Sequence, residues 1–405
     1  MAAIDEIGPL GTRGLHAAAR RVGSVLAFGV LPVVLTLSIL AVTYSQKTFL
    51  FDFKGDLYGA GQAIVHGHNP YNPGFLATQA AIQRAGGTPQ TIFALPVYAA
   101  PALVASVPFS LLPYRLAAIL FAALLIGSLA LGLRLLGVRD WRCYGVTFAC
   151  WPFLLGLRLG GLTPLIVLGA AVAWRWRDRL WPPAIAIATI VVAKLFPWPL
   201  AVWLLVTRRF RTLALTLVIG GVVTFAAWAV IGFAGIAEYP RMLSNLAFVE
   251  EGHGPSLVAL LLAAGVPAGV AKVAALAAAA ALLGAAWRFV GRPGGERRAF
   301  GMIVMAALTA SPLVWQHYLV LVFVPIALMS PTLSAIWFAP MLAYLAPGAQ
   351  TQGNVLEILP YLAIEATVIG QLCGVGALIS KRSWLRASLL PGLTRASAAA
   401  GSLRH

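Results

Sequence analysis

The side chains best suited to chemistry lie between the first two long apolar runs, in residues 49–73, FLFDFKGDLYGAGQAIVHGHNPYNP. Two carboxylates, Asp52 and Asp56, stand four positions apart there, in a chain with only 12 Asp and Glu residues. Charge beside hydrocarbon is costly to keep, so acids gathered there are candidates for chemistry. A carboxylate can act as a general base, and this spacing in a helix lets each acid raise the proton affinity of the other. The alternative is a solvated loop in which an Asp caps a helix. Other polar residues of the stretch are Lys54, Tyr58, His66 and His68.

Three further residues are candidates for binding a phosphate. His317 lies in the motif WQHY at the end of an apolar run. Its imidazole can donate a hydrogen bond to a phosphate, and the alternative is a packed histidine between aromatic anchors. Lys194 is a lone ammonium in an apolar hairpin, where it either binds phosphate as a point charge or extends to the membrane interface. Arg158 is a similar candidate.

A second polar stretch, EEGHGPS, occupies residues 250–256. We expect Glu251 and His253 to shape a second substrate site. Adjacent polar residues of this kind are an incomplete ligand set, so we predict no metal site. The sequence has no Walker loop, no Gly-rich dinucleotide fingerprint, no GxSxG and no HExxH, so we expect no cofactor and no nucleotide-binding site. Glu365 is expected to be a buried, hydrogen-bonded carboxyl. The isolated cysteines, expected to serve in packing, are Cys143, Cys150 and Cys373.

The composition identifies the class of protein. Of the 405 residues, 60% are apolar and 10% are charged, and the mean hydropathy is +0.88. These values exclude a soluble multidomain protein and predict an all-α polytopic membrane protein, because the apolar runs lack the alternation of barrel strands. The net charge of +17 comes from short basic clusters between apolar runs. Such clusters mark cytoplasmic loops rather than a nucleic-acid surface, so no nucleic-acid partner is expected.

The basic clusters also predict a topology. A cytoplasmic segment, 1–21, precedes a single transmembrane domain, 22–380, and a cytoplasmic tail, 381–405, follows it. The first span, at about 22–44, is too long for a signal peptide and is expected to be retained. Outer loops are predicted at 45–113, which includes a proline-broken, non-crossing membrane helix at 93–114, and at 234–255. Later spans are expected at about 114–137, 143–157, 163–176, 181–206 (a pair), 213–233, 267–288, 299–314, 317–330, 333–346 and 360–380, which makes twelve with both termini inside.

Several motifs, taken in order, resemble those of one enzyme family. The acidic loop has the form DFKGDLYGAGQAIVHGHNPYNP at 52–73. It is followed by PVYAAP and PFSLLP, and then by LRLGGLTPL (157–165), KLFPWPL (194–200) and SPLVWQHYLVL (311–321). This ordered set is similar to glycosyltransferase family 87, whose members include polyprenol-phosphate-mannose-dependent alpha-mannosyltransferases of actinobacteria. Where many relatives have a Gly-Gln-Asn-Pro stretch, this chain has Gly160-Gly161-Leu162-Thr163-Pro164.

The resemblance implies a GT-C type fold of about 12 transmembrane helices with helices in the outer loops. It implies transfer of a sugar, most often mannose, from a polyprenyl-phosphate donor to a glycolipid or glycan acceptor, with inversion. The active site would lie on the periplasmic (extracytoplasmic) side of the inner (plasma) membrane. The aspartate of the family's first loop maps best onto Asp52, with Asp56 as the second choice. His317, Lys194 and Arg158 would hold the donor phosphate, and Tyr58, Glu251 and His253 would contact substrate.

Two other classes of function remain open at this point. A transporter or flippase for a lipid-linked or small solute is also compatible with twelve spans. Transporters usually show inverted repeats with paired breaks at the midplane, and we find no such pairing here. The second alternative is a non-catalytic scaffold for envelope assembly.

Overall fold

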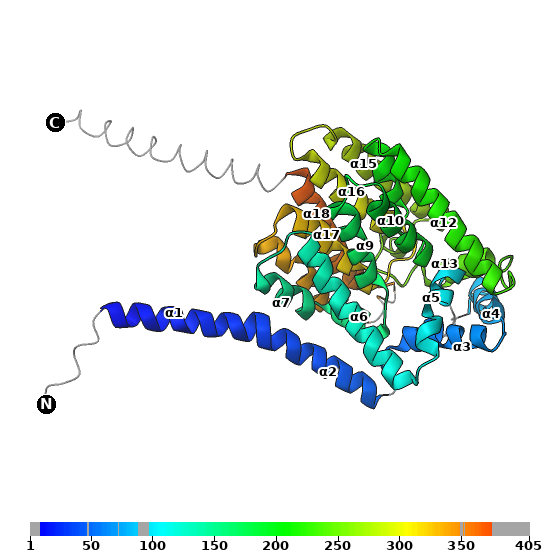
Figure 1. Ribbon diagram of the computed structural model, residues 1–405, viewed down its shortest axis with the longest axis horizontal. Helices are drawn as coiled ribbons and strands as arrows, with labels where there is room; N and C mark the ends of the chain where they lie inside the picture. Colours follow the sequence, from blue (N-terminus) through cyan, green and yellow to red (C-terminus); the bar gives the residue numbers. More distant parts are fainter. Residues whose placement is uncertain are drawn as a thin grey trace.

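The computed structural model describes residues 9–46, 48–71, 73–87, 97–348, 351 and 353–374. Within these ranges the chain forms helices and no strand, so the predicted all-α fold is confirmed. The helices gather into one bundle with a long N-terminal helix along its side (Figure 1). One apolar core runs through the bundle from Leu50 to Leu372. The predicted cytoplasmic tail, 381–405, and the first eight residues lie outside the described residues.

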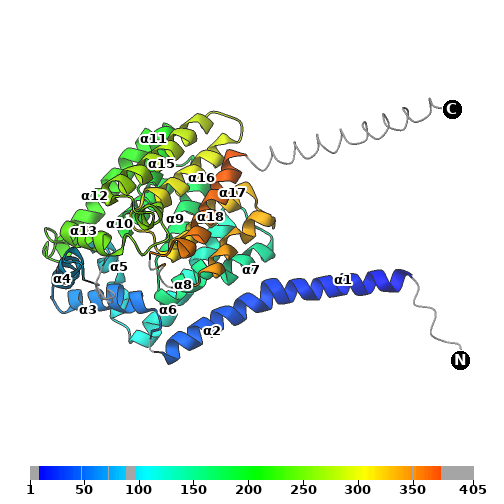
Figure 2. The same ribbon diagram turned by 180° about the vertical axis from the view of Figure 1, so that it is seen from behind.

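The N-terminal rod consists of α1 (Pro9–Val25), a π-turn η1 (Leu26–Val30) and α2 (Leu31–Ser45). Its apolar part, His16–Ser45, is long enough to cross a membrane and contains the expected first span. Helix α1 continues through residue 21 without a break, so residues 9–21, before the expected span, are helical as well. Figures 1 and 2 show the rod beside the bundle. It touches the bundle at Phe28, whose backbone approaches Gly145 too closely for a side chain there.

The acidic loop folds into short helices rather than an open loop. The chain then continues into a short apolar helix, α5 (Ala100–Ser110), that contains Pro108. This helix lies in the region where we expected a proline-broken, non-crossing segment. At 11 residues this helix is far shorter than the roughly 20 residues that a span needs. The elements are η2 (Phe53–Gly59, a π-helix), α3 (Ala60–Val65), α4 (Pro73–Arg84) and α5 (Ala100–Ser110).

The middle of the chain forms the first half of the core. Asp140 caps the second of its helices by accepting a hydrogen bond from the backbone N–H of Arg142. The third and fourth helices meet at a bend of 114°. The bend falls at Gly160, whose φ of +82° is a left-handed conformation that glycine adopts without strain. The elements are α6 (Tyr114–Leu135), α7 (Trp141–Ala149), α8 (Trp151–Leu159) and α9 (Thr163–Arg175).

Residues 181–289 begin with two helices of 13 and 8 residues, separated at Lys194, where a tight pair of spans was expected. A long apolar helix follows, and an amphipathic helix then covers one end of the bundle beside α4 (Figure 1). The elements are α10 (Trp181–Ala193), α11 (Pro199–Val206), α12 (Phe210–Val230), α13 (Tyr239–Glu250), α14 (Leu257–Ala263) and α15 (Ala268–Phe289).

The last part of the chain supplies the centre of the core, because one helix, α16, is buried along most of its length. Glu365 in the final helix is buried, as expected. Its carboxyl makes no hydrogen bond to the part of the chain that the structure describes, contrary to expectation. The elements are α16 (Gly295–Ala310), η3 (Gln316–Val322), α17 (Phe323–Met329), η4 (Ala335–Leu345) and α18 (Val355–Cys373).

The count of twelve spans is not confirmed. Among the described residues five helices are long and apolar enough to cross a membrane, or six if α8 and α9 form one bent span. The apolar segments expected at 299–314, 317–330 and 333–346 are helices of 7 to 16 residues. Helices buried inside a bundle are as apolar as helices that face lipid, so composition alone does not separate the two.

Candidate active site

A π-helix holds the acidic loop against α5. In η2 the helical turn is wider than an α-turn, so two backbone carbonyls are available to side chains of the neighbouring helix. The hydroxyl of Ser106 donates to the carbonyl of Leu57 (2.8 Å), and that of Ser110 donates to the carbonyl of Tyr58 (2.9 Å). These bonds fix the turn that carries Asp56.

Asp52 and Asp56 lie at the start and in the middle of this turn. Asp52 is half-buried and Asp56 is 7% exposed. Neither carboxylate makes a hydrogen bond or an ion pair to the described residues, so both are available to a substrate. Burial raises the pKa of Asp52 from 3.8 to about 6, opposed by the charge of Lys194. Burial first, and then the charge of Asp52, raise the pKa of Asp56 well above its usual range, again opposed by Lys194. Burial and the charge of Asp52 therefore both favour the protonated form of Asp56.

Lys194 reaches this acid pair from the break between α10 and α11. Its ammonium lies over the rings of two tyrosines, 4.0 Å from the centroid of Tyr318 and 5.2 Å from that of Tyr98. The ring of Phe196 stacks on that of Tyr318, with the two ring centroids 4.7 Å apart. Within the described part of the chain Lys194 has no carboxylate within 4.0 Å. The site therefore holds a positive charge between aromatic faces that is available to an anion.

The segment that carries Tyr98 is fixed by hydrogen bonds from two other tyrosines. The hydroxyl of Tyr71 donates to the carbonyl of Tyr98 (3.1 Å), and the hydroxyl of Tyr239 donates to the carbonyl of Val97 (3.3 Å). Tyr71 also stacks on Trp228 at 5.4 Å. This network ties the segment before α5 to α12 and α13, and so places the ring of Tyr98 beside Lys194.

His317 lies next to Tyr318 in η3, and the two rings meet edge to face at 4.9 Å. The side chain is 3% exposed, and its Nδ1 has no hydrogen-bond partner among the described residues. The bend between α8 and α9 leaves room for it. A Cβ at Gly161 would lie 2.7 Å from Cδ2 of His317, and a Cβ at Gly156 would lie 3.2 Å from its Cβ. The two glycines thus allow the imidazole to pack against the backbone.

Replacing Gly161 with Ala is expected to displace His317. The added methyl group would sit 2.9 Å from Nε2 of a buried ring, so the imidazole or the bend must move. Overpacking of this kind costs about 1–3 kcal/mol of folding free energy. Thermal unfolding of the purified protein measures the loss. Gly127→Ala in α6 is the matched control, because nothing lies within 4 Å of a Cβ there. Equal stability of the two variants would contradict this packing.

Arg158 lies just before the bend between α8 and α9, whereas Tyr58 lies in η2 itself, so the two have different roles. Arg158 is half-buried in the last turn of α8, just before the bend at Gly160. A Cβ at Gly160 would lie 2.7 Å from the Cβ of Phe53, so this bend touches the start of η2. Arg158 makes no hydrogen bond or ion pair to the described chain. The hydroxyl of Tyr58 donates to the carbonyl of Leu112 (2.8 Å), which makes Tyr58 a positioning residue for the loop.

Glu251 and His253 lie in the turn after α13, beyond the wall of the site. Glu251 forms an ion pair of 2.7 Å with Lys272 of α15. Nδ1 of His253 lies 3.1 Å from the carbonyl of Val249, and the backbone carbonyl of His253 accepts from the N–H of Thr351 (2.9 Å). These contacts fix the turn, and the preceding turn of α13 faces the cavity described next.

A cavity of about 340 Å³ lies beside Lys194. Its walls come from α13, from the segment before α5 and from the turn between α16 and η3, which includes Trp315. A second, apolar groove of about 520 Å³ lies between α5, α6, α9 and α10. The two hollows share Ala193, the residue before Lys194, and the groove also touches Leu57 of η2. An apolar groove thus ends beside the cation Lys194 and touches η2, the helix that carries Asp56.

The structure therefore brings together Asp52, Asp56, Lys194 and His317, four of the residues singled out from sequence, from three separate parts of the chain. It adds aromatic residues that sequence reasoning missed as site residues. Tyr98 lies in PVYAAP and Tyr318 in WQHY, so both stood inside recognised motifs. Among the described residues no group of three His, Cys, Asp or Glu side chains is placed to hold a metal ion.

The comparisons with known proteins identify a family. The family model for Glycosyltransferase family 87 matches residues 95–314, which is more than half of the chain. The matched range includes Lys194 and Arg158, and it ends just before His317. Asp52 and Asp56 precede it. No curated protein and no solved structure matches the chain.

Proposed function

Since the chain belongs to glycosyltransferase family 87 and is a membrane glycosyltransferase, we propose that it transfers a sugar from a polyprenyl-phosphate donor to a hydroxyl of a glycolipid or glycan. Mannose is the first sugar to test. One observation carries this proposal: an apolar groove reaches Ala193 and Leu57, the sequence neighbours of the cation Lys194 and of the carboxylate Asp56. A soluble donor needs no such groove, whereas a lipid phosphate needs both the groove and the cation.

The donor's chain lies in the groove between α5, α6, α9 and α10. The walls there are almost entirely apolar and include Phe109, Phe121 and Ile190. With the lipid so placed, the phosphate is next to Ala193 and meets Lys194. His317 and Arg158 are the further donors to the phosphate. The ammonium acts as a point charge that stabilises the phosphate as it leaves, and the buried surroundings strengthen that interaction.

Asp52 is the general base. Its carboxylate accepts the proton of the acceptor hydroxyl while the hydroxyl oxygen bonds to the anomeric carbon, and the bond from that carbon to the phosphate oxygen breaks. One displacement of this kind inverts the anomeric configuration. Asp56, whose protonated form burial favours, donates a hydrogen bond to substrate or to Asp52. No cofactor is part of this step, since lipid phosphate is itself the leaving group.

The acceptor enters from the side of α13. Tyr239 and Leu246 of this helix line the cavity beside Lys194. Glu251 and His253 lie in the turn that follows and contact the acceptor's polar groups. Tyr58 acts behind the site, through the loop that it anchors. A glycolipid or glycan suits this path because it brings several hydroxyl groups past Lys194, which lines this cavity.

The site faces the extracytoplasmic side of a plasma membrane in this proposal, and the protein is multi-pass. Two basic turns support this orientation, the one between α15 and α16 and the one between α9 and α10. Both lie at the end of the bundle opposite η2, α3 and α4 (Figures 1 and 2). Basic loops face the cytoplasm, so the acid pair faces outward.

The transfer rate is expected to fall as pH falls through about 6. The folded protein raises the pKa of Asp52 from 3.8 to about 6. The carboxylate is therefore ionised above that pH and protonated below it, and only the ionised form accepts a proton. A profile of kcat/KM against pH measures this fall in rate on the acid side, the acid limb of the profile. An acid limb near pH 4, the ordinary range of an aspartate, would contradict a buried base.

The donor class is tested by direct transfer. Purified protein in detergent is given a lipid-extract acceptor with radiolabelled mannose, carried either on polyprenyl phosphate or on a nucleotide. We expect label to enter the acceptor from the lipid donor alone. Transfer from the nucleotide donor alone would overturn the proposal. If neither donor gives product and the protein moves lipid-linked sugar across vesicle membranes, the transporter alternative replaces it.

A further inference from the structure

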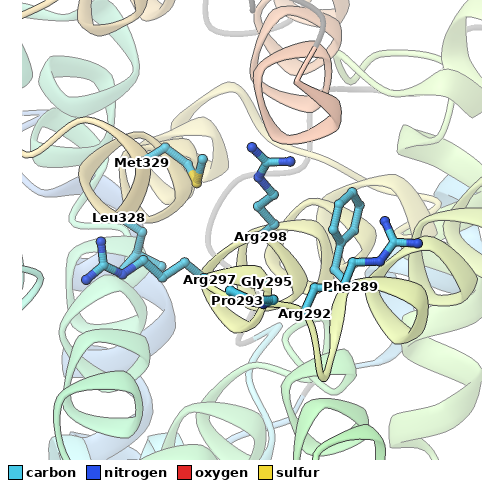
Figure 3. A pocket seen from close by; sticks show the side chains of 9 residues that line it. Phe289, Arg292, Pro293, Gly295, Arg297, Arg298, Leu328 and Met329 are labelled. Atoms are coloured by element: carbon cyan, nitrogen blue, oxygen red, sulfur yellow. The ribbon is translucent and has the colours of Figure 1, made fainter.

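A second polar cavity lies at the other end of the bundle, in the turn between α15 and α16. Its volume is about 340 Å³. Figure 3 shows three arginine side chains around it, with Arg298 between Arg297 and Arg292. The remaining wall is apolar and includes Phe289, Leu328 and Met329, the last two from the end of α17.

Positive charge is concentrated here without a counter-ion. The guanidinium of Arg292 lies 5.5 Å and that of Arg298 lies 5.6 Å from the centroid of one ring, Phe289. Arg297 lines the same cavity from the first turn of α16. None of the three forms an ion pair with the described residues. Like charges held around one hollow repel each other, and an anion removes that cost.

The carboxylates at this end are already paired. Glu296 lies between the arginines in sequence, but it forms ion pairs with Arg209 and, at 3.5 Å, with Arg177. Asp178 pairs with Arg209 at 3.1 Å, and Asp140, also at this end, pairs with a different arginine, Arg142. Beyond residue 374 the sequence contains no Asp or Glu. The described part of the chain therefore offers these arginines no unpaired carboxylate at this end of the bundle.

We propose that Arg292, Arg297 and Arg298 bind the phosphate of an anionic phospholipid headgroup. Guanidinium groups match phosphate oxygens in geometry and charge. The apolar wall and the position at the ends of membrane-length helices suit a lipid better than a soluble phosphate. Basic pockets between helices on the cytoplasmic side are suited to such headgroups, because that leaflet is anionic.

This site is separate from the candidate active site. Helix α16 starts at the arginine cavity and ends at Ala310, which lines the cavity beside Lys194. Its 16 residues place the two sites about 24 Å apart along the helix axis. Lipid binding at the arginines can therefore be measured without sugar transfer, and it does not depend on the proposed reaction.

The test is a binding titration of the full-length purified protein with phosphatidylglycerol, and separately with phosphatidylcholine, read by native mass spectrometry. The variant is Arg292→Gln/Arg297→Gln/Arg298→Gln. Its affinity for phosphatidylglycerol should fall roughly 100-fold, since each basic residue near an anionic lipid contributes about a fivefold gain. The control is Arg139→Gln/Arg175→Gln/Arg179→Gln, which removes the same charge from exposed arginines at the same end of the bundle. Its affinity for phosphatidylglycerol should stay within about twofold of wild type.

Three results would overturn the proposal. The first is equal loss in variant and control, which would mean general charge attraction. The second is equal affinity of wild type for both lipids. The third is full displacement of phosphatidylglycerol by inorganic phosphate, which would assign the arginines to a soluble anion. If the triple variant unfolds, Arg297→Gln replaces it, because this side chain is exposed and its loss should still weaken binding about fivefold.

Discussion

Asp52→Asn is expected to lower kcat/KM for sugar transfer by roughly 10³-fold, within the range that general-base catalysis supplies. Asparagine has the same shape and accepts no proton. The substitution also removes a charge from a half-buried position where burial opposes ionisation. The fold should therefore be retained, and the melting temperature should not fall. Steady-state kinetics with a lipid-linked donor and thermal unfolding of the same preparation give both numbers.

Asp56→Asn is the comparison that identifies the base. Asp56 is the more buried acid, and both burial and the charge of Asp52 favour its protonated form. An amide resembles the protonated carboxyl that burial favours, so the expected loss is about tenfold. The assignment would be reversed if Asp56→Asn lost the larger factor while Asp52→Asn remained active.

Lys194→Met is expected to lower kcat/KM by roughly 10²- to 10³-fold, as loss of one preorganised electrostatic group does. Methionine keeps the apolar stem between Tyr98 and Tyr318 and removes the charge. The acid limb of the pH profile should move to higher pH, because the charge of Lys194 lowers the pKa of Asp52. A residue that only fills space would leave the acid limb unchanged.

Lys54→Met is the matched control for this prediction. Lys54 lies on the same loop as the acids, is exposed, and has its ammonium 5.3 Å from the ring centroid of Tyr114. Its removal takes one positive charge from the same face without touching the cavity beside Lys194. We expect kcat/KM and the acid limb to stay close to wild type. A shift equal to that of Lys194→Met would show that only the net charge of the loop matters.

Sequence alone located the charged members of the site because charge is rare in this chain. Asp52, Lys194 and His317 are separated by more than a hundred residues each, yet all three stand out against apolar surroundings. Their meeting in the structure follows from the bend at Gly160 and the break at Lys194, both of which lie inside recognisable motifs. Rare residue types at helix ends are thus the part of the site that a single sequence predicts well.

The aromatic members of the site did not stand out. Tyr98 and Tyr318 belong to a chain with 10% aromatic residues, and such residues are common at membrane interfaces. Their role depends on how the two rings enclose Lys194. For Tyr98 this placement is set by hydrogen bonds from Tyr71 and Tyr239 to the segment that carries it. The ion pair of Glu251 with Lys272 was missed for the same reason, because Lys272 lies in an Ala-rich helix far along the chain.

The helical class of the fold was predictable from composition, but the number of spans was not. Helix α16 is apolar because it is the centre of the core, and η4 is apolar although it has only 11 residues. A hydropathy pattern reports removal from water and does not distinguish protein from lipid as the new surroundings. Span counts for bundles with many short helices therefore need the packing as well as the sequence.

The most direct test of the central claim is the anomeric configuration of the product. A polyprenyl-phosphate sugar of known configuration is supplied to the purified protein, and the new glycosidic bond is assigned by nuclear magnetic resonance. A single displacement with Asp52 as base predicts the opposite configuration in the product. Retained configuration would contradict it, because a single in-line displacement at the anomeric carbon inverts that centre.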